Sequence, residues 1–520
     1  MLNKHQQAAV DSPSKRLLVL AGAGTGKTYT MIERIKRLIA DGVEPSSILV
    51  LTFTNAAAFE MGQRFQTDSD EARPTFQTFH GFCYHLMIKS PQVRGALGYK
   101  QVPNIITPER TKELDARTRA SHHIKASATS LNKDAGTGKD AFEHAVYWKV
   151  MKNQMRVDNL ISFDHLCKGV CGLFSNNSPV VKEYLEKYKY IFVDEFQDTD
   201  KVQWDFVQSF KDSSIFLVGD VQQAIYEFRG ADSTIIQAVA EDPEWETLRI
   251  VDNYRSTSNI CQFANDIVFA NETTRLKLVS DRVGTEPITE SQDTPWALED
   301  NRGLRSVVAS AISDLEHGTV AILLCTNMEV NFVAESVRYA LPGNYIDKSR
   351  TINLLAAVLD GKFRARWLAS LLPRDTYVKY LKQEALKTGD LESVFERSYQ
   401  TKELVNTLRK IQDILSSPGF ALPKSIAIAE FLGIQNPEFG HIEETVEGII
   451  RAVTQIVESE RSPVYVGTIH SVKGLEFDSV YLLGAGSKVF SLKTEAQKNL
   501  FYVGVTRAKE KLFVGMEDRD

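Results

Sequence analysis

The chain has 520 residues, of which 43% are hydrophobic and 25% are charged, and its formal net charge is -6. This length allows about two to four domains, and the composition is ordinary for globular proteins, which excludes fibrous and largely disordered classes. The small negative charge excludes a surface that is basic throughout, so any contact with nucleic acid must be made by a local groove.

Cysteine usage and hydropathy indicate the compartment. Cys167 and Cys171 are the only cysteines close in sequence, and neither a second pair nor a His at zinc spacing accompanies them. This pattern favours buried free thiols in a reducing environment. The N-terminus is polar, and no stretch approaches the roughly 18 apolar residues of a membrane span. We therefore expect a cytoplasmic protein with no membrane partner.

Apolar runs alternate with helical patterns in two parts of the chain. In the first part, strands are predicted at 17–20, 48–53, 190–193, 215–218 and 247–251. In the second part, strands are predicted at 320–324, 464–468, 480–483 and 512–514. Because strands that alternate with helices form parallel sheets, the predicted fold class is α/β.

Each part is interrupted by a more polar segment. The first interruption, 87–186, has helical patterns at 111–124 and 140–155. The second, about 351–460, is also predicted to be mainly helical. The stretch 271–303 has many charges and little apolar periodicity, so we expect a loop or linker there.

Residues 18–28, LVLAGAGTGKT, are typical of a buried strand that leads into a phosphate-binding loop. The glycines allow backbone N–H groups to face phosphates, and the following helix adds its positive N-terminus. Lys27 is expected to bridge the β- and γ-phosphates, and Thr28 to hold Mg²⁺. ATP and Mg²⁺ are the expected cofactors. The loop residues predicted to bind the nucleotide are Ala21, Gly22, Ala23, Gly24, Thr25, Gly26, Lys27 and Thr28.

An apolar strand at 190–193 ends in two carboxylates, Asp194 and Glu195. In an ATPase with this arrangement, Asp194 would hold the metal and Glu195 would polarise the attacking water. The string continues as DEFQDT, residues 194–199, and this longer string resembles the UvrD/Rep branch of the superfamily 1 DNA helicases very specifically.

The family's other motifs follow in order across nearly the whole chain, and several imply contacts with ATP. The string LNKHQ resembles the glutamine motif, in which Gln6 would read the adenine edge. NYRS resembles a motif in which Tyr254 would stack on adenine and Arg255 would reach the γ-phosphate. Tyr29 replaces an arginine that commonly flanks the adenine, and aromatic stacking could substitute for it.

Three further strings complete the predicted ATP site. In VGD…QAIYEFRGA, Gln223 would sense the γ-phosphate. In TIHSVKGLEF, Glu476 is placed for the ribose. In YVGVTRA, Arg507 is the candidate arginine finger, a role worth about 10³ to 10⁵ in rate in comparable enzymes. By this resemblance the catalytic residues are Lys27, Asp194, Glu195, Gln223, Arg255 and Arg507.

The resemblance also implies contacts with single-stranded DNA, from TFTN, TFHGFC, the Gln223 string and the Glu476 string. Aromatic side chains among these residues would stack on bases, which is worth roughly 1–3 kcal/mol per base and ignores sequence. The residues assigned to DNA are Phe53, Asn55, Thr78, His80, Tyr226, Phe228 and His470. Ala56 stands where a lysine is usual in the family, and Cys325 where an arginine is.

The resemblance implies two RecA-like domains with the ATP site in the cleft between them. The first would comprise 1–86 and 187–270, with 87–186 as a helical accessory insertion. The second would comprise 271–350 and 461–520, with 351–460 as a reduced insertion, because the chain is shorter than full-length family members. This compact size resembles the Gabija antiphage helicase subunit, which acts beside a separate nuclease.

The function implied by the resemblance is ATP-dependent translocation on single-stranded DNA, 3′ to 5′, with movement or duplex unwinding in repair, replication or antiphage defence. The expected partners are single-stranded DNA, or DNA with a single-stranded tail, and a nuclease subunit. One alternative is a nucleotide-gated DNA sensor that activates that nuclease. A second alternative is an RNA-directed motor.

Overall fold

The computed structural model describes residues 2–65, 73–106, 108–121, 139–267, 274–291, 302–340, 464–487 and 489–516. The chain divides into two units, one of residues 1–297, 323–326 and 467–520 and the other of residues 298–322 and 327–466. The predicted insertion at 351–460 lies outside the described residues. In the part that the structure describes, no helix combines the length and apolar character needed to cross a membrane.

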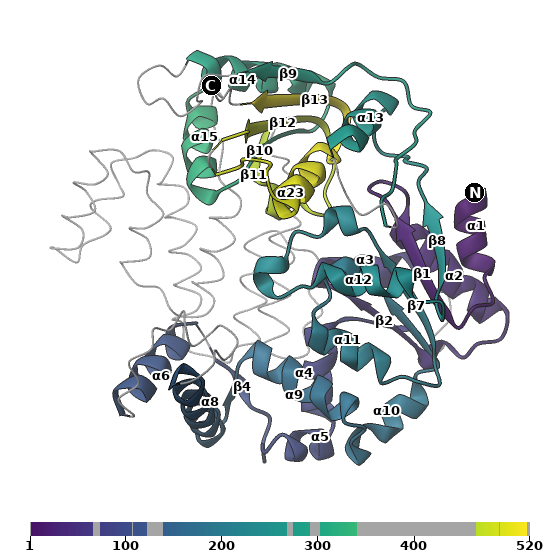
Figure 1. The fold of residues 1–520 in the computed structure, drawn as a ribbon, viewed down its shortest axis with the longest axis vertical. Coiled ribbons are helices and arrows are strands. Elements are labelled where there is room, and N and C mark those ends of the chain that lie inside the picture. The colour runs from purple at the N-terminus through teal and green to yellow at the C-terminus, as the bar shows by residue number, and fades with distance from the viewer. Residues whose placement is uncertain are drawn as a thin grey trace, which may run out of the picture. The chain divides into compact units, whose positions relative to one another are not determined.

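The first unit contains a six-stranded parallel sheet (Figure 1). In spatial order its strands are β3 (Thr75–Thr78), β2 (Ile48–Thr52), β6 (Tyr190–Val193), β7 (Ser214–Gly219), β1 (Arg16–Ala21) and β8 (Glu246–Ile250). The register places Leu18 and Val193 on either side of Leu217. The strands predicted for this part of the chain are confirmed, and β3 is an additional strand that the sequence analysis missed.

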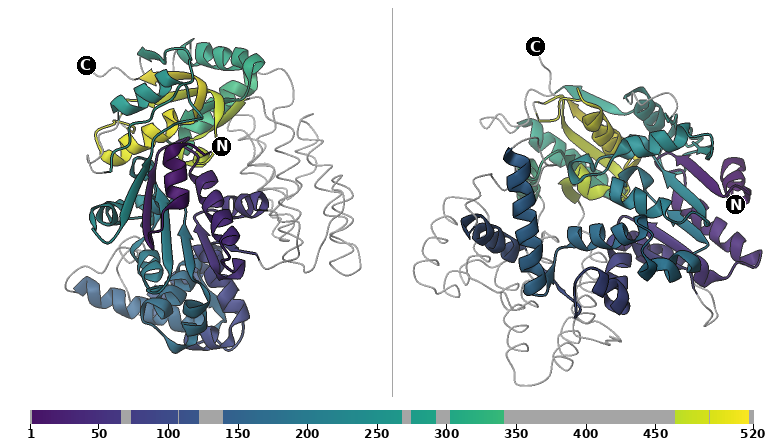
Figure 2. Two further views of the ribbon diagram at one scale, coloured as in Figure 1. Left: turned by 90° about the vertical axis from the view of Figure 1, so that its right-hand side faces the viewer. Right: turned by 60° about the horizontal axis from the view of Figure 1, so that its bottom comes forward.

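Both faces of this sheet are buried under helices, because alternate residues of its apolar strands point to opposite sides (Figures 1 and 2). Leu18, Leu49 and Ile191 belong to the core on one face, and Leu17, Ile48 and Phe192 to the core on the other. The first core includes residues of α4 (Phe79–Lys89), α9 (Phe163–Ser175), α11 (Lys201–Gln208) and α12 (Ser233–Glu241). The second includes residues of α1 (Lys4–Asp11), α2 (Lys27–Ala40) and α3 (Asn55–Arg64).

The first predicted insertion is divided between two cores. Helices α6 (Pro108–Ser121) and α8 (Lys139–Val157) confirm the helical patterns there and lie side by side (Figures 1 and 2). They share a small core around Met151, beside the short strands β4 (Asn104–Ile105) and β5 (Leu160–Ile161). Helix α9, in contrast, buries Val170 and Phe174 in the core of the six-stranded sheet. The domain boundaries at 86 and 187 stay a prediction.

A second sheet has five strands. In spatial order they are β11 (Val464–Thr468), β10 (Val320–Leu324), β12 (Phe477–Ala485), β13 (Ala508–Met516) and β9 (Ile288–Ser291). Strand β13 pairs in parallel with both β12 and β9. The prediction of a linker over 271–303 is therefore wrong at β9, a short and largely polar strand whose pairing is not evident from local sequence.

The remaining described elements are helices and 3₁₀ turns outside the sheets. The helices are α5 (Pro91–Ala96), α10 (Lys182–Lys187), α13 (Ser258–Ile267), α14 (Arg302–Ser313), α15 (Asn327–Ala340) and α23 (Glu495–Val505). The 3₁₀ turns are η1 (Pro45–Ser47), η2 (Pro179–Val181), η3 (Phe196–Asp198), η4 (Val221–Gln223), η5 (Glu227–Arg229), η6 (Asp314–His317) and η7 (Ile469–Val472).

The aromatic core beneath the sheet gives a test of this packing. Phe206 on α11 is fully buried and contacts the rings of Phe79 and Phe174. We expect Phe206→Ala to lower the free energy of unfolding by about 3–5 kcal/mol, because it leaves a cavity, as measured by chemical denaturation. The control Val283→Ala removes an exposed side chain and should change this free energy by less than about 0.5 kcal/mol. Equal effects would contradict the packing.

Candidate functional site

The loop between β1 and α2 has a backbone that favours glycine. Gly24 and Gly26 have φ angles of +67° and +78°, in the left-handed region. A Cβ atom at Gly24 would lie 2.7 Å from Asn253 Nδ2. Gly26 is also the N-cap of α2, which begins at Lys27. The positive end of α2 therefore opens onto the loop, and this arrangement fits a bound triphosphate.

Two amide side chains hold this loop. Gln6 Nε2 donates to the carbonyl oxygen of Thr25 at 3.0 Å, and Gln6 Oε1 accepts from the backbone N–H of Asn3 at 3.0 Å. Asn253 Nδ2 donates to the carbonyl oxygen of Ala23 at 2.7 Å. Gln6 thus positions the loop with one amide N–H and one lone pair of its amide oxygen. The predicted contact with adenine would use the other N–H and the other lone pair. Asn253 was not predicted as a site residue, although it begins the NYRS string.

Two exposed tyrosines lie beside the loop. The N–H of Tyr254 donates to the carbonyl oxygen of Gly24 at 2.9 Å, and its hydroxyl accepts from Asn3 Nδ2 at 2.7 Å. Tyr29 lies in the first turn of α2. Both rings expose surface on which a base could stack, and the adenine contacts assigned to them stay a prediction.

Asp194 directly follows β6 and is buried. Its N–H donates to the carbonyl oxygen of Leu51 at 2.9 Å, whereas its Oδ1 atom has no hydrogen-bond partner among the described residues. A buried carboxylate oxygen without a donor suits a cation ligand. Burial raises the pKa of Asp194, and the neighbouring charge of Glu195 raises it further. The unpaired Oδ1 atom of Asp194 therefore fits Mg²⁺, and the role of the Thr28 hydroxyl, at the start of α2, stays a prediction.

Glu195 has a left-handed backbone, with φ at +51°, which is uncommon for a residue with a side chain. Its carboxylate accepts a hydrogen bond from Gln197 Nε2. Burial acts to raise the pKa of Glu195, but the charges of Lys27 and Lys473 and the bond from Gln197 lower it overall. Glu195 is therefore ionised at neutral pH.

A chain of hydrogen bonds joins Glu195 to Arg507. Gln197 Oε1 accepts from the N–H of Asp220 at 2.9 Å, and Asp220 Oδ2 accepts from Gln223 Nε2 at 2.7 Å. Gln223 Oε1 accepts from Arg507 Nη2 at 3.3 Å, and Arg507 is only 1% exposed. The structure thus brings together three residues that the sequence assigned to catalysis. Gln197 and Asp220, which link them, were not predicted.

A second arginine lies close to Arg507. Arg255 Nε donates to Glu476 Oε2 at 2.8 Å, and Arg255 Nη1 donates to the carbonyl oxygen of Thr506 at 3.1 Å. Burial lowers the pKa of Arg507, and the charge of Arg255 lowers it further. An anion between the two guanidinium groups would relieve this repulsion, as a γ-phosphate would. Glu476 also pairs with Lys509, at 3.1 Å, and its contact with ribose stays a prediction.

Lys473 is a central residue that the sequence analysis did not single out, although it lies in the TIHSVKGLEF string. Its Nζ atom donates to the Asp198 carboxylate and, at 2.9 Å, to the carbonyl oxygen of Gln223. The same atom lies 3.9 Å from Glu195 Oε2 and 5.1 Å from the ring centroid of Tyr226. Lys473 therefore contacts groups on both the predicted ATP side and the predicted DNA side.

The predicted DNA-contacting aromatic residues gather around Tyr226. The rings of Phe53 and Tyr226 stack with 5.1 Å between centroids and 16° between planes. Phe228 and His470 lie close by, with 5.3 Å between their centroids. Phe228 is 69% exposed, whereas Tyr226 is half-buried between Phe53 and Lys473. Phe228 therefore offers the most open surface of this group to a base.

The remaining predicted DNA residues lie at the starts of α3 and α4. Thr78 Oγ1 accepts from the N–H of Gly81 at 2.9 Å and donates to Asn55 Oδ1 at 3.4 Å, so it caps α4 and positions Asn55. His80 is exposed on α4, and its ring meets the ring of Phe163 edge-on at 6.2 Å. The exposed Phe163 was not predicted, because one aromatic residue in a helical pattern carries no signal of its own.

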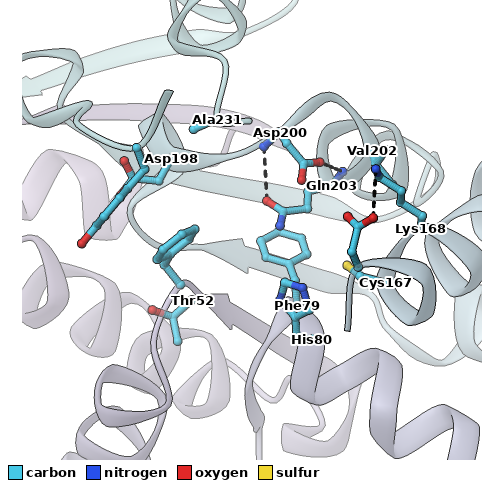
Figure 3. A pocket seen from close by; sticks show the side chains of 13 residues that line it. Thr52, Phe79, His80, Cys167, Lys168, Asp198, Asp200, Val202, Gln203 and Ala231 are labelled. Carbon is cyan, nitrogen blue, oxygen red and sulfur yellow. Dashed lines mark hydrogen bonds and ion pairs between the residues drawn. The ribbon is translucent and has the colours of Figure 1, made fainter. Parts of the chain in front are cut away.

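A pocket of about 350 Å³ lies beside these residues (Figure 3). It is bordered by Asp198, which binds Lys473, and by His80 and Tyr226 from the predicted DNA group. The lining residues are Thr52, Phe53, Phe79, His80, Asp164, Cys167, Lys168, Asp198, Asp200, Val202, Gln203, Tyr226 and Ala231. The pocket therefore lies next to the partner of Lys473 and next to the residues assigned to DNA.

We expect Lys473→Met and Asp198→Asn to have strongly non-additive effects on the free energy of unfolding. Each single change leaves a buried charge without its partner, at a cost of about 3–5 kcal/mol, whereas the double change removes both charges. Chemical denaturation of the three variants measures the coupling. The exposed pair Lys201 and Asp205 is the control, with an expected coupling below about 1 kcal/mol. Additive effects of Lys473→Met and Asp198→Asn would contradict the pairing.

The carboxyl of Asp194 predicts a pH dependence of nucleotide binding. Burial raises its pKa to about 7, so a proton competes with a cation for this group. We expect the affinity for magnesium nucleotide to weaken as the pH falls from about 8 to about 6, with up to about one proton released on binding. Calorimetry in two buffers of different ionisation enthalpy measures the release. It should vanish in Asp194→Asn, and release that persists there would assign the proton to another group.

Comparison with known proteins agrees with these motifs. The family model for the UvrD/REP helicase N-terminal domain matches residues 2–244, and that for the UvrD-like helicase C-terminal domain matches residues 368–519. The ATP-dependent DNA helicase PcrA of Staphylococcus epidermidis is 24% identical to this chain, over 99% of this chain and 83% of PcrA. DNA helicase II of Haemophilus influenzae is 26% identical, with the same coverage. With its ordered motifs and its parallel α/β sheets, the chain belongs to the UvrD/Rep family of helicases.

Proposed function

We propose that this chain is a DNA-stimulated ATPase that uses ATP hydrolysis to move along single-stranded DNA, including the tail of a partly single-stranded duplex. One relative is named an ATP-dependent DNA helicase and the other DNA helicase II, which supports the proposal. The observation that carries the proposal is that the segment 220–230 contacts both the residues assigned to ATP hydrolysis and the residues assigned to DNA. Gln223 in this segment accepts a hydrogen bond from Arg507, while Tyr226 and Phe228 form the aromatic group with His470.

In the proposed ATP site, the loop before α2 and Lys27 bind the β- and γ-phosphates. Thr28 and Asp194 would hold Mg²⁺, which neutralises charge on the phosphate oxygens when bound. Glu195 stays ionised and accepts a hydrogen bond from the attacking water, and Gln197 fixes its orientation. Asp194 and Gln197 are buried, which strengthens their electrostatic contacts because little water is present to screen them.

The two arginines supply the proposed charge stabilisation. Arg507 and Arg255 would bind the γ-phosphoryl oxygens as the bond to the β-phosphate breaks. Arg507 can donate to these oxygens while it remains bonded to Gln223, because a guanidinium has several N–H groups. Loss of the phosphate then shifts Arg507, and Gln223 transmits that shift to Tyr226 and Phe228. We propose that this shift changes the grip on DNA.

The finer parts of the proposal come from the family resemblance. These are the 3′ to 5′ polarity and a role in repair, replication or antiphage defence, whereas the proposed cytoplasmic location comes from the polar N-terminus and the cysteine usage. The alternative is a nucleotide-gated sensor that activates a partner nuclease. Such a sensor needs to hydrolyse little ATP. The connected positions of Glu195, Gln223 and Arg507 favour hydrolysis over pure sensing.

Steady-state ATP hydrolysis with and without single-stranded DNA tests the proposed motor. We expect stimulation by DNA, more weakly by single-stranded RNA, and a fall of about 10²-fold or more in Lys27→Ala, which removes a phosphate contact. Phe228→Ala should spare the basal rate and raise the DNA concentration for half-stimulation by roughly five- to a hundredfold, since base stacking is lost. An equal melting temperature for this variant is the control for folding. A folded protein that binds ATP without stimulation by DNA would overturn the motor and leave the sensor.

A further inference from the structure

Three cysteines from two helices bring their sulfur atoms together in the first unit. Cys83 lies on α4, and Cys167 and Cys171 lie one turn apart on α9, so both face α4. The Sγ atoms are 4.0 Å apart for Cys83 and Cys167, 3.9 Å for Cys83 and Cys171, and 3.8 Å for Cys167 and Cys171. All three are buried free thiols. They form an almost equilateral triangle.

This triangle has the dimensions of a metal–thiolate site. With a metal–sulfur distance of about 2.3 Å, sulfurs lie about 3.8 Å apart in a tetrahedral site and about 4.0 Å apart in a trigonal one. The observed separations span that interval, so a cation could be bound with almost no movement of the helices.

The site also has a path to solvent. Cys167 lines the same pocket as His80 and Asp200 (Figure 3). Asp164 and Lys168, which form an ion pair, also line it. Among the described residues, no His, Asp or Glu atom joins the three sulfurs within 4.8 Å. A cation bound to the sulfurs would therefore have its remaining coordination position on the Cys167 side, where the pocket provides space.

We propose that Cys83, Cys167 and Cys171 bind one thiophilic d¹⁰ cation, Zn²⁺ or Cu⁺, through three thiolate sulfurs. Thiolates select these ions over Mg²⁺ and Ca²⁺, which prefer oxygen ligands. In the reaction, three S–H bonds break, three metal–sulfur bonds form and three protons leave to solvent. No group is oxidised or reduced. The site is separate from the residues assigned to ATP and Mg²⁺.

The bound cation would fasten α4 to α9. Cys83 follows His80 by one turn of α4, and α4 begins at the Thr78 cap beside Asn55. Fixing Cys83 would therefore fix the helix that carries the proposed DNA contact. This consequence for DNA rests on the proposed function, whereas the binding of the cation does not.

Metal titration of the reduced, metal-free, untagged full chain tests the site. Co²⁺ is the optical probe, because thiolate ligands give it intense near-ultraviolet charge-transfer absorption. We expect one Co²⁺ per chain, displaced by one Zn²⁺, and a separate titration with Cu⁺ decides between the two ions. Cys83→Ser and Cys171→Ser should weaken binding by more than about a hundredfold, since even outer-shell changes weaken it about 10- to 100-fold. Cys261→Ser removes a buried thiol elsewhere and should not change binding.

X-ray absorption on the unaltered protein keeps the proposal testable if a serine variant does not fold. Three sulfur neighbours at about 2.3 Å would support the site. A shell of nitrogen and oxygen, no binding of any of the three ions, or unchanged binding in a folded Cys171→Ser protein would overturn it. Because the titration contains neither ATP nor DNA, its failure is distinguishable from failure of the motor.

Discussion

Burial of charge is the constraint on which the site depends. The side chains of Asp198, Asp220, Lys473 and Arg507 are all nearly inaccessible to water. An isolated ion in such a place costs several kcal/mol, so every one of these groups must be paired or hydrogen-bonded. Their pairing forms one connected network, in which charge added at one point changes the energies of all the others. A triphosphate beside Arg507 would therefore act on groups that it does not touch.

In the proposed motor, the backbone of the segment 220–230 would convert this electrostatic dependence into a mechanical one. Asn499 Nδ2 donates to the carbonyl oxygens of Val221 and Ala224, both at 3.3 Å. Gln222 Oε1 accepts from the N–H of Leu276 at 2.7 Å. The start of the segment is thus held on two sides by neighbouring elements, while its later part carries the exposed ring of Phe228. In the proposed motor, a displacement at the start would be passed along the segment to that ring, and this would couple the ATP site to the DNA contact.

Local features could be predicted from the sequence, and contacts between distant residues could not. The strands β1, β6 and β7 are continuous apolar runs, and the glycines before Lys27 require a special backbone, so both features are visible locally. Strand β9 is short and polar, and only pairing with β13 identifies it. In the same way, Lys473 gains its importance from carboxylates far away in sequence, and Cys83 joins the thiol pair on α9 only through tertiary packing.

Helix α9 shows that position in the sequence does not tell which hydrophobic core a helix belongs to. By position it belongs to the polar insertion, yet Leu166, Val170 and Phe174 are buried in the same core as the strands of the ATP-binding sheet. Helix α4 shares that core and carries His80 at its exposed start. The proposed DNA contact of His80 is therefore made from a closely packed helix. Residues on packed helices keep their positions better than residues on loops. In the proposed motor, a movement at the ATP site would then reach this DNA contact without being absorbed by a flexible loop.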